Sequence, residues 1–312
     1  MARITISVDH VVAPVDRRIL GGFAEHLGRC VYGGIYDEGS PLADERGFRK
    51  DVIEAVRRLR PPVLRWPGGN FVSGYHWTDG IGPKENRPRR MELAWRTEES
   101  NRFGTDEFLA FCEAVGAEPY LCVNMGTGTM DEAMAWVEYC NGTGDTEWAN
   151  RRRENGHEEP YRVRYWGLGN EMYGPWQIGQ KTAEDYVKEA RQWAKVLTWT
   201  DPSIELVSCG ENGWSEWDDI VISGLAEFVR WHIREHIPER VGLPGFLRGR
   251  RYVAYQGHPK YFNFYETETP QTLESPAYRA AQCPYAADPG GDQGIPGHVA
   301  HDLRGRRLDR DG

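Results

Sequence analysis

Long apolar runs are missing from this chain. None of its 312 residues belongs to a run approaching the roughly 20 apolar residues that a membrane-spanning helix needs. The N-terminus also has no apolar core of the kind found in secretory signals. Positive charge is scarce as well, because 38 Lys and Arg residues face 47 Asp and Glu residues, a net charge of −9. We therefore expect a cytoplasmic protein with neither nucleic acid nor membrane as a partner.

Paired cysteines and nucleotide-binding glycine motifs are also missing. The six cysteines stand singly, without CxxC spacing, and in a chain without a signal they are expected to be reduced core thiols. No GxGxxG motif or P-loop follows the first expected strands. The sequence therefore argues against a disulfide-stabilised fold and against a nucleotide-binding one.

Apolar helical stripes alternate with short strand-like segments through most of the chain. We expect helices over 48–59, 105–115, 131–140 and 182–197, and strands over 62–66, 120–124, 163–169 and 204–208. Thr105 and Thr182 are placed as N-caps, and Gly116 lies just past a helix end. Repeated βα units predict a parallel sheet, either a closed barrel or a doubly wound sheet. Without a nucleotide-binding motif, the barrel is favoured.

The segment 164–174 carries the strongest functional signal. It is an aromatic and aliphatic run that ends in Asn170 and Glu171. A buried parallel strand has this pattern when it delivers polar side chains to its carboxyl end, where β/α barrels carry their active sites. A carboxyl group beside aromatic rings there is suited to act as a general acid. Taken alone, the pair is better explained as the start of an ordinary loop.

Four further segments place polar or aromatic residues where strands give way to loops. They carry Glu25, Arg65 with Asn70, Trp95, and Asn124. Each has a structural alternative, since Arg65 could belong to a buried ion pair, Asn70 to a turn and Trp95 to the core. Gathered at one barrel mouth, however, they would suit an uncharged ligand rich in hydroxyl groups, which needs hydrogen-bonding partners and aromatic platforms.

These segments resemble the α-L-arabinofuranosidases of glycoside hydrolase family 51. The resemblance runs from about residue 18 to about residue 230. Its motifs are GFAEHLGR at 22–29, VYGGIY at 31–36, RWPGGNFVSGY at 65–75, ELAW at 92–95, CNG at 140–142 and WGLGNE at 166–171. It implies a (β/α)8 barrel with an added β-sandwich, and glycoside hydrolysis by the retaining route.

The resemblance also implies roles for individual residues. Glu171 matches the family's general acid/base, which protonates the leaving-group oxygen and then activates water. The family's sugar-binding positions fall on Glu25, Arg65, Asn70, Trp95 and Asn170. Of these, Asn170 would hydrogen-bond the sugar 2-hydroxyl. The implied partner is a saccharide with terminal α-L-arabinofuranosyl residues, no metal or organic cofactor is expected, and a homo-oligomer is left open.

One element of the family pattern is missing. A retaining glycosidase needs a second carboxylate about 5–5.5 Å from the first, as the nucleophile. Glu147 and Glu216, each followed by Trp, come too early and in helix or loop context. Glu266 and Glu268 lie at a more suitable distance along the chain, but nothing around them matches the family. The sequence alone assigns no nucleophile.

The sequence changes character after about residue 235. Between Gly257 and Gly312 only five residues are Ile, Leu, Val or Met. We therefore expect an N-terminal strand segment over 1–17, a partial barrel catalytic domain over 18–255 and an irregular tail over 256–312. The expected fold is thus an α/β barrel that is incomplete at its C-terminal end and lacks the family's β-sandwich. A truncated or frame-shifted gene product, or a divergent tail, is the hypothesis that this pattern suggests.

Three other functions are compatible with the sequence. His232, Glu235 and His236 fit the HxxEH pattern of zinc peptidases, although the motif is short and a third ligand is not evident. An inert sugar-binding fragment would keep Glu171 and have no nucleophile. Another retaining barrel glycosidase, for a xylo- or gluco-configured substrate, would share the barrel chemistry, and only the resemblance at Glu25 and Asn70 favours arabinofuranose.

Overall fold

The computed structural model describes residues 15–231, 246–253, 261–267, 269, 271–272 and 275–276. The chain divides into two compact units, Met1–Ala226 and Glu227–Gly312. None of the helices within the described ranges combines the length and the apolarity needed to cross a membrane. The first unit contains every residue that the sequence predicts for the site.

The first unit alternates strands and helices. Its strands are β1 (Gly22–Phe23), β2 (Val63–Trp66), β3 (Arg90–Glu92), β4 (Thr97–Glu99), β5 (Glu118–Val123), β6 (Tyr165–Leu168) and β7 (Glu205–Ser208). Its α-helices are α1 (Lys50–Leu59), α2 (Thr105–Val115), α3 (Met130–Asn141), α4 (Glu147–Glu154), α5 (Ala183–Thr200) and the start of α6 (Glu216–Trp231). Short 3-10 helices η1 (Arg17–Leu20), η2 (Asn70–Gly74), η3 (Trp77–Gly80) and η4 (Lys84–Asn86) lie between them.

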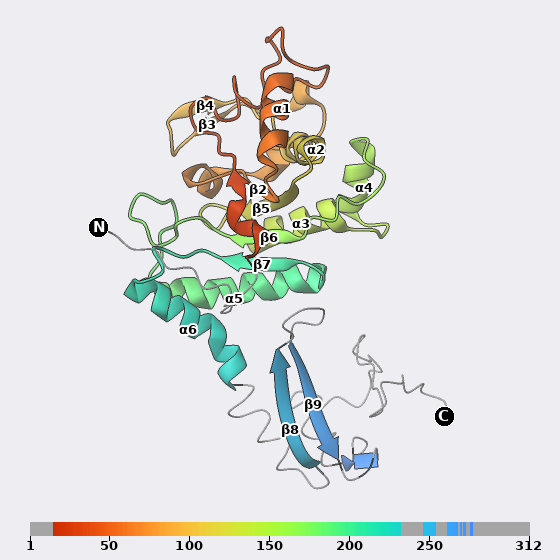
Figure 1. The fold of residues 1–312 in the computed structure, drawn as a ribbon, viewed down its shortest axis with the longest axis vertical. Coiled ribbons are helices and arrows are strands. Elements are labelled where there is room, and N and C mark those ends of the chain that lie inside the picture. Colours follow the sequence, from red (N-terminus) through yellow and green to blue (C-terminus); the bar gives the residue numbers. More distant parts are fainter. Residues whose placement is uncertain are drawn as a thin grey trace, which may run out of the picture. The chain divides into compact units, whose positions relative to one another are not determined.

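Five strands form one parallel sheet in the order β1-β2-β5-β6-β7, while β3 and β4 form a separate antiparallel pair. Along the chain, each strand of this sheet therefore pairs with the next strand of the same sheet. Figure 1 shows β2, β5, β6 and β7 succeeding one another in this order. A doubly wound sheet would reverse its strand order at a switch point. The strand order observed here has no such reversal. It is the order of a β/α barrel, as the sequence predicts.

Alternation along the strands separates the two faces of this sheet. Trp66, Leu121 and Trp166 lie opposite one another in the strand register and are fully buried. Trp66 stacks on Phe108 of α2 at a centroid distance of 5.3 Å. Trp136 of α3 meets Trp66 and Trp166 edge to face. This aromatic layer packs α2 and α3 against one face of the sheet. The alternate residues of the strands, including Arg65, therefore belong to the other face.

The helix ends mostly follow the predicted signals. Thr182 caps α5, since its hydroxyl accepts a hydrogen bond from the Asp185 N–H at 3.2 Å. Gly116 ends α2 in the left-handed conformation, with φ of 76°. Thr105, however, is the first residue of α2 rather than its N-cap, which is Gly104. The Thr105 hydroxyl instead accepts from the Trp136 indole N–H at 3.1 Å, so tertiary packing takes the group that a cap would have used.

The second unit contains an antiparallel pair, β8 (Phe246–Val253) with β9 (Tyr261–Thr267). The expectation of irregular structure over 256–312 is therefore wrong for residues 261–267. That expectation counted aliphatic residues alone, whereas the sequence of β9, YFNFYET, is rich in aromatic residues, which favour strands equally. Glu266 belongs to this strand, and Glu268 lies outside the described residues.

Candidate active site

The predicted site residues lie along one edge of the parallel sheet. Glu25 follows β1, Asn70 follows β2, Asn124 follows β5, and Asn170 and Glu171 follow β6. Because the strands are parallel, these positions all belong to their carboxyl ends. Two hydrogen-bonded groups of side chains stand at this edge, one around Glu25 and one around Asn170.

The first group joins Glu25 to Trp95. Glu25 is buried, and its Oε1 accepts a hydrogen bond from the Trp95 indole nitrogen at 3.3 Å. Trp95 itself is 37% exposed, which leaves part of its ring available to a ligand. The N–H of Phe71 lies 3.5 Å from the same oxygen, and Asn70 is the residue before it, at the start of η2. The structure thus brings three predicted residues, Glu25, Asn70 and Trp95, to one place.

A glycine turn shapes the space around Glu25. It follows the cis peptide bond between Trp66 and Pro67, and Gly68 has a φ of 108°. A Cβ atom at Gly68 would lie 2.2 Å from the Glu25 Cβ. Only glycine combines this backbone conformation with so close an approach. The glycines of the motif RWPGGN therefore leave the space that the Glu25 side chain occupies.

The second group joins Arg65 to Asn170. The Arg65 guanidinium donates to the Asn170 Oδ1 at 2.9 Å, and it also contacts the Cys122 sulfur at 3.3 Å. Arg65 therefore binds a predicted site residue directly, and the described residues record no ion pair for it. Since a guanidinium can only donate, this bond sets which end of the Asn170 amide points inward.

Glu171 stands at the rim of this edge. It is half-buried, and its backbone has a φ of 44°, an uncommon value for a residue other than glycine. Its Oε2 accepts a hydrogen bond from the Trp176 indole nitrogen at 2.7 Å. The strained backbone and the indole donor together hold the carboxylate in a defined direction.

A tyrosine and a second carboxylate lie in the electrostatic neighbourhood of Glu171. Burial raises the pKa of the Tyr173 phenol, and the carboxylates of Glu171 and Glu211 raise it further. Tyr173 also meets the Trp176 ring edge to face, at a centroid distance of 6.0 Å. Glu211 follows β7, so it too belongs to a strand carboxyl end.

Three residues of this region were missed by reasoning from the sequence: Ser73, Trp176 and Gln177. Gln177 is buried, accepts from the Asn170 Nδ2 at 3.4 Å and donates to the Ser73 hydroxyl. The signal that could have found Gln177 is its position six residues after Glu171, in the loop of the same βα unit. Asn124, by contrast, is occupied in holding its own loop, through bonds with Tyr75, Gly126 and Thr127.

A buried histidine next to Glu25 connects two neighbouring side chains, Trp66 and Glu99. His26 follows Glu25, accepts from the Trp66 indole nitrogen at Nε2 (3.0 Å) and contacts Glu99 through Nδ1 (3.0 Å). An indole N–H only donates, so Nε2 carries no proton and Nδ1–H faces the Glu99 carboxylate. Burial acts to raise the pKa of Glu99, but hydrogen bonds from His26, Tyr32 and the Asn101 N–H outweigh it and lower that pKa.

Metal ligation finds no support in the residues that the structure describes. They contain no group of three or more His, Cys, Asp or Glu side chains suited to hold an ion. His232, Glu235 and His236, the residues of the zinc-peptidase hypothesis, lie outside the described residues. That hypothesis gains no geometric argument.

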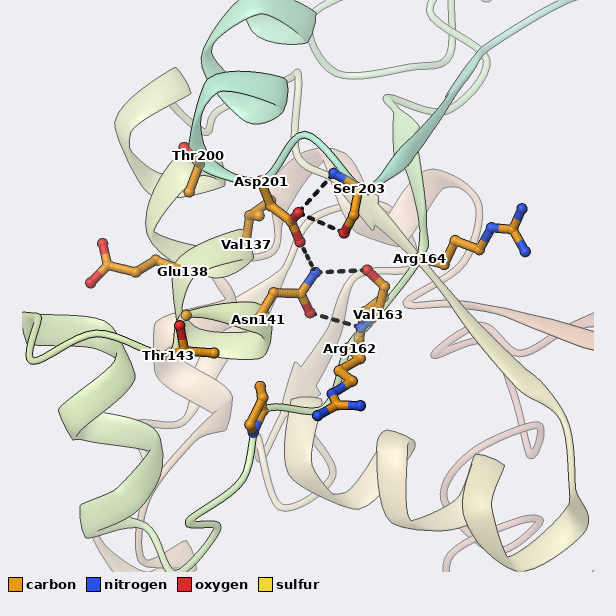
Figure 2. Close-up of a pocket in the computed structure, with 12 residues that line it drawn as sticks. Val137, Glu138, Asn141, Thr143, Arg162, Val163, Arg164, Thr200, Asp201 and Ser203 are labelled. Carbon is orange, nitrogen blue, oxygen red and sulfur yellow. Dashed lines mark hydrogen bonds between the residues drawn. The ribbon is translucent and has the colours of Figure 1, made fainter. Parts of the chain in front are cut away.

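A cavity of about 590 Å3 lies at the opposite ends of the strands. Figure 2 shows Asn141 at its centre, between Val163 and Asp201. The Asn141 amide donates to the Val163 carbonyl (2.9 Å) and to Asp201 (2.7 Å), and it accepts from the Val163 N–H (2.7 Å). These bonds join the end of α3 to the segments before β6 and β7. The amino-terminal face of a β/α barrel serves stability, and the cavity belongs to that face.

The fold and the site together define a β/α-barrel protein with a polar, aromatic-lined site at the carboxyl ends of its strands. The sequence model of the alpha-L-arabinofuranosidase 1 domain matches residues 55–232. The chain therefore belongs to the α-L-arabinofuranosidases of glycoside hydrolase family 51.

Individual relatives agree with this assignment. Alpha-L-arabinofuranosidase C of Emericella nidulans is 61% identical over 215 residues, which are 69% of this chain and 43% of that protein. An intracellular exo-alpha-(1->5)-L-arabinofuranosidase 1 of Bacillus subtilis is 49% identical over 242 residues, 77% of this chain and 47% of that protein. The chain therefore spans less than half the length of these two relatives.

A solved structure also matches about two thirds of the chain. The crystal structure of the Thermotoga maritima α-L-arabinofuranosidase in complex with arabinose has a TM-score of 0.64 and 58% sequence identity. The match covers 66% of this chain and 42% of that one. The chain therefore spans less than half of this solved structure as well.

Proposed function

We propose that this chain carries the arabinofuranosyl-binding part of a retaining α-L-arabinofuranosidase, with Glu171 as general acid/base. The observation that carries the proposal is the arrangement at the carboxyl end of β6. There, Arg65 orients Asn170, and Trp176 holds the carboxylate of Glu171. A general acid needs a fixed direction toward the leaving-group oxygen, and this arrangement supplies one.

The proposed substrate is a saccharide that ends in an α-L-arabinofuranosyl residue. Glu25 offers a carboxylate oxygen to sugar hydroxyls, Asn70 and Asn170 offer carboxamides, and Trp95 offers part of its ring. The names of the relatives, and the arabinose complex of the Thermotoga protein, support this class of sugar. We propose a cytoplasmic location, which the word intracellular in the name of the Bacillus relative supports.

The second candidate function is sugar binding without turnover. One observation favours it: no carboxylate in the sequence stands in a segment that matches the family's nucleophile. A retaining mechanism needs a nucleophilic carboxylate about 5–5.5 Å away. Glu211, Glu266 and Glu268 are the residues to test for that role.

Hydrolysis of an aryl α-L-arabinofuranoside by the purified chain tests the proposal. The control is Glu171→Gln, which keeps the shape and removes the proton transfer. Turnover that this substitution abolishes would establish the activity and show that the chain holds a nucleophile. Binding of methyl α-L-arabinofuranoside without turnover would identify the sugar-binding alternative, and absence of both would refute the proposal.

A further inference from the structure

We infer that Gln177 is a positioning residue, which sets the direction in which Asn170 presents its amide to the sugar. The inference rests on the proposed function, because it concerns the same site. Gln177 lies in the loop between β6 and α5 and is only 4% exposed. Its amide joins two groups that would otherwise be unconnected, Asn170 at the strand end and Ser73 in η2.

A chain of four side chains carries the argument. Arg65 donates to the Asn170 Oδ1 at 2.9 Å, the Asn170 Nδ2 donates to the Gln177 Oε1 at 3.4 Å, and the Gln177 Nε2 donates to the Ser73 Oγ. Every donor meets an acceptor. If either amide were turned over, an N–H group would face another donor, at Arg65 or between the two amides. The cation at one end therefore determines the orientation of both amides.

This polarity makes Asn170 a donor toward a ligand. Its oxygen is directed at Arg65, and its nitrogen carries two hydrogens, of which the recorded bonds among the described residues use one, toward Gln177. The other hydrogen is available to a sugar hydroxyl acting as acceptor. The Asn170–Gln177 contact is long for N–H···O, so it is the link that can tighten when a ligand binds.

The loop that carries Gln177 is packed tightly enough to hold it in place. A Cβ atom at Gly179 would lie 2.7 Å from the Gly126 Cα, and one at Gly126 would lie 2.4 Å from the Ser73 carbonyl oxygen. The Thr127 N–H donates to the same carbonyl at 3.0 Å. The loops after β2, β5 and β6 therefore touch through their backbones, and Gln177 is buried where they meet.

Two substitutions separate the hydrogen bond from simple packing. Gln177→Glu keeps an acceptor for Asn170, and the Ser73 hydroxyl can donate to the new carboxyl group. Gln177→Met keeps the volume and removes both bonds. Gln180→Ala is the matched control, because Gln180 is an exposed glutamine of the same loop whose side chain donates to the Tyr173 carbonyl; its backbone N–H, which donates to the Gln177 carbonyl, is kept in the variant.

The first readout is discrimination between methyl α-L-arabinofuranoside and its 2-deoxy analogue, measured as the ratio of Kd values by calorimetry. We expect about a tenfold preference for the 2-hydroxyl in the unsubstituted chain, in Gln177→Glu and in Gln180→Ala. In Gln177→Met we expect the preference to fall to less than about twofold. Equal ratios in Gln177→Met and Gln177→Glu would overturn the inference.

The second readout needs no sugar. Hydrogen exchange of the Asn170 side-chain amide, followed by NMR, should be about tenfold faster in Gln177→Met than in the unsubstituted chain and unchanged in Gln177→Glu. Equal exchange in all variants would overturn the inference even if no sugar binds. Failure of the unsubstituted chain to bind either furanoside would instead refute the proposed function, so the two failures are distinguishable.

Discussion

Substitution of Gly68 by alanine tests most directly whether the glycine turn leaves the space that the Glu25 side chain needs. The new Cβ atom would lie 2.2 Å from the Glu25 Cβ and 2.5 Å from its Cα and Cγ. Part of this contact is with backbone, so rotation of a side chain alone cannot relieve it. The φ of 108° at this position is also unfavourable for alanine. We therefore expect Glu25 to be displaced, and sugar binding to be weakened with it.

A second glycine separates backbone strain from the collision. Gly156 has a φ of 96°, and a Cβ atom there would meet nothing within 4 Å. Strain alone should cost about 1 kcal/mol in Gly156→Ala, whereas strain and overlap together should cost about 3 kcal/mol in Gly68→Ala. For a unit of this size these losses correspond to falls in Tm of about 3 °C and about 9 °C.

The assay combines thermal unfolding with calorimetric titration of methyl α-L-arabinofuranoside. Gly156→Ala should bind the sugar as the unsubstituted chain does, and Gly68→Ala should bind it at least about tenfold more weakly at a temperature where both are folded. Equal losses of stability in the two variants, or unchanged sugar binding in Gly68→Ala, would refute the reasoning.

Three other predictions concern the neighbourhood of the site and the opposite face. Trp176→Phe removes the N–H that donates to Glu171. It should lower turnover of an aryl arabinofuranoside by about tenfold and change the Kd for the methyl furanoside by less than about twofold. An unchanged rate of turnover would count against this prediction. The pKa of Glu99 is lowered in the fold, so its stabilisation is present above the ordinary glutamate pKa and lost as the pH falls below it. The difference in Tm between the unsubstituted chain and Glu99→Gln should therefore shrink between pH 6 and pH 3, and a constant difference would contradict this. Asn141→Ala breaks three hydrogen bonds and leaves the Val163 N–H unpaired, so it should destabilise by about 2–3 kcal/mol in denaturant unfolding, against less than about 0.5 kcal/mol for Asn150→Ala, whose amide contacts are exposed or only partly buried.

The local elements follow from local patterns in the sequence. The strand over 62–66 and the helix beginning after Thr182 were both visible as periodic apolar segments with their own boundary residues, and both are present. Thr105 shows where this reasoning stops. Its hydroxyl accepts a hydrogen bond from Trp136, a residue 31 positions away, and no local pattern in the sequence reveals this contact.

The site was predicted only in part, for the same reason. Glu25, Asn70, Asn170 and Glu171 each follow a strand, and parallel strands bring their carboxyl ends to one edge, so their proximity follows from the order of elements. Gln177 and Ser73 do not directly follow a strand, and in the sequence a buried glutamine and a buried serine look like ordinary loop residues, so only the position of Gln177 in the loop after Glu171 pointed to it.

The sequence by itself determined the barrel class, the family and the carboxylate after β6, because these depend on periodicity and on motifs of consecutive residues. Only the tertiary structure decided which atoms meet: Trp95 with Glu25, Arg65 with Asn170, and Asn170 with Gln177. Hydrogen bonds depend on distance and direction between groups that lie from 7 to 105 residues apart, and the folded chain alone determines these.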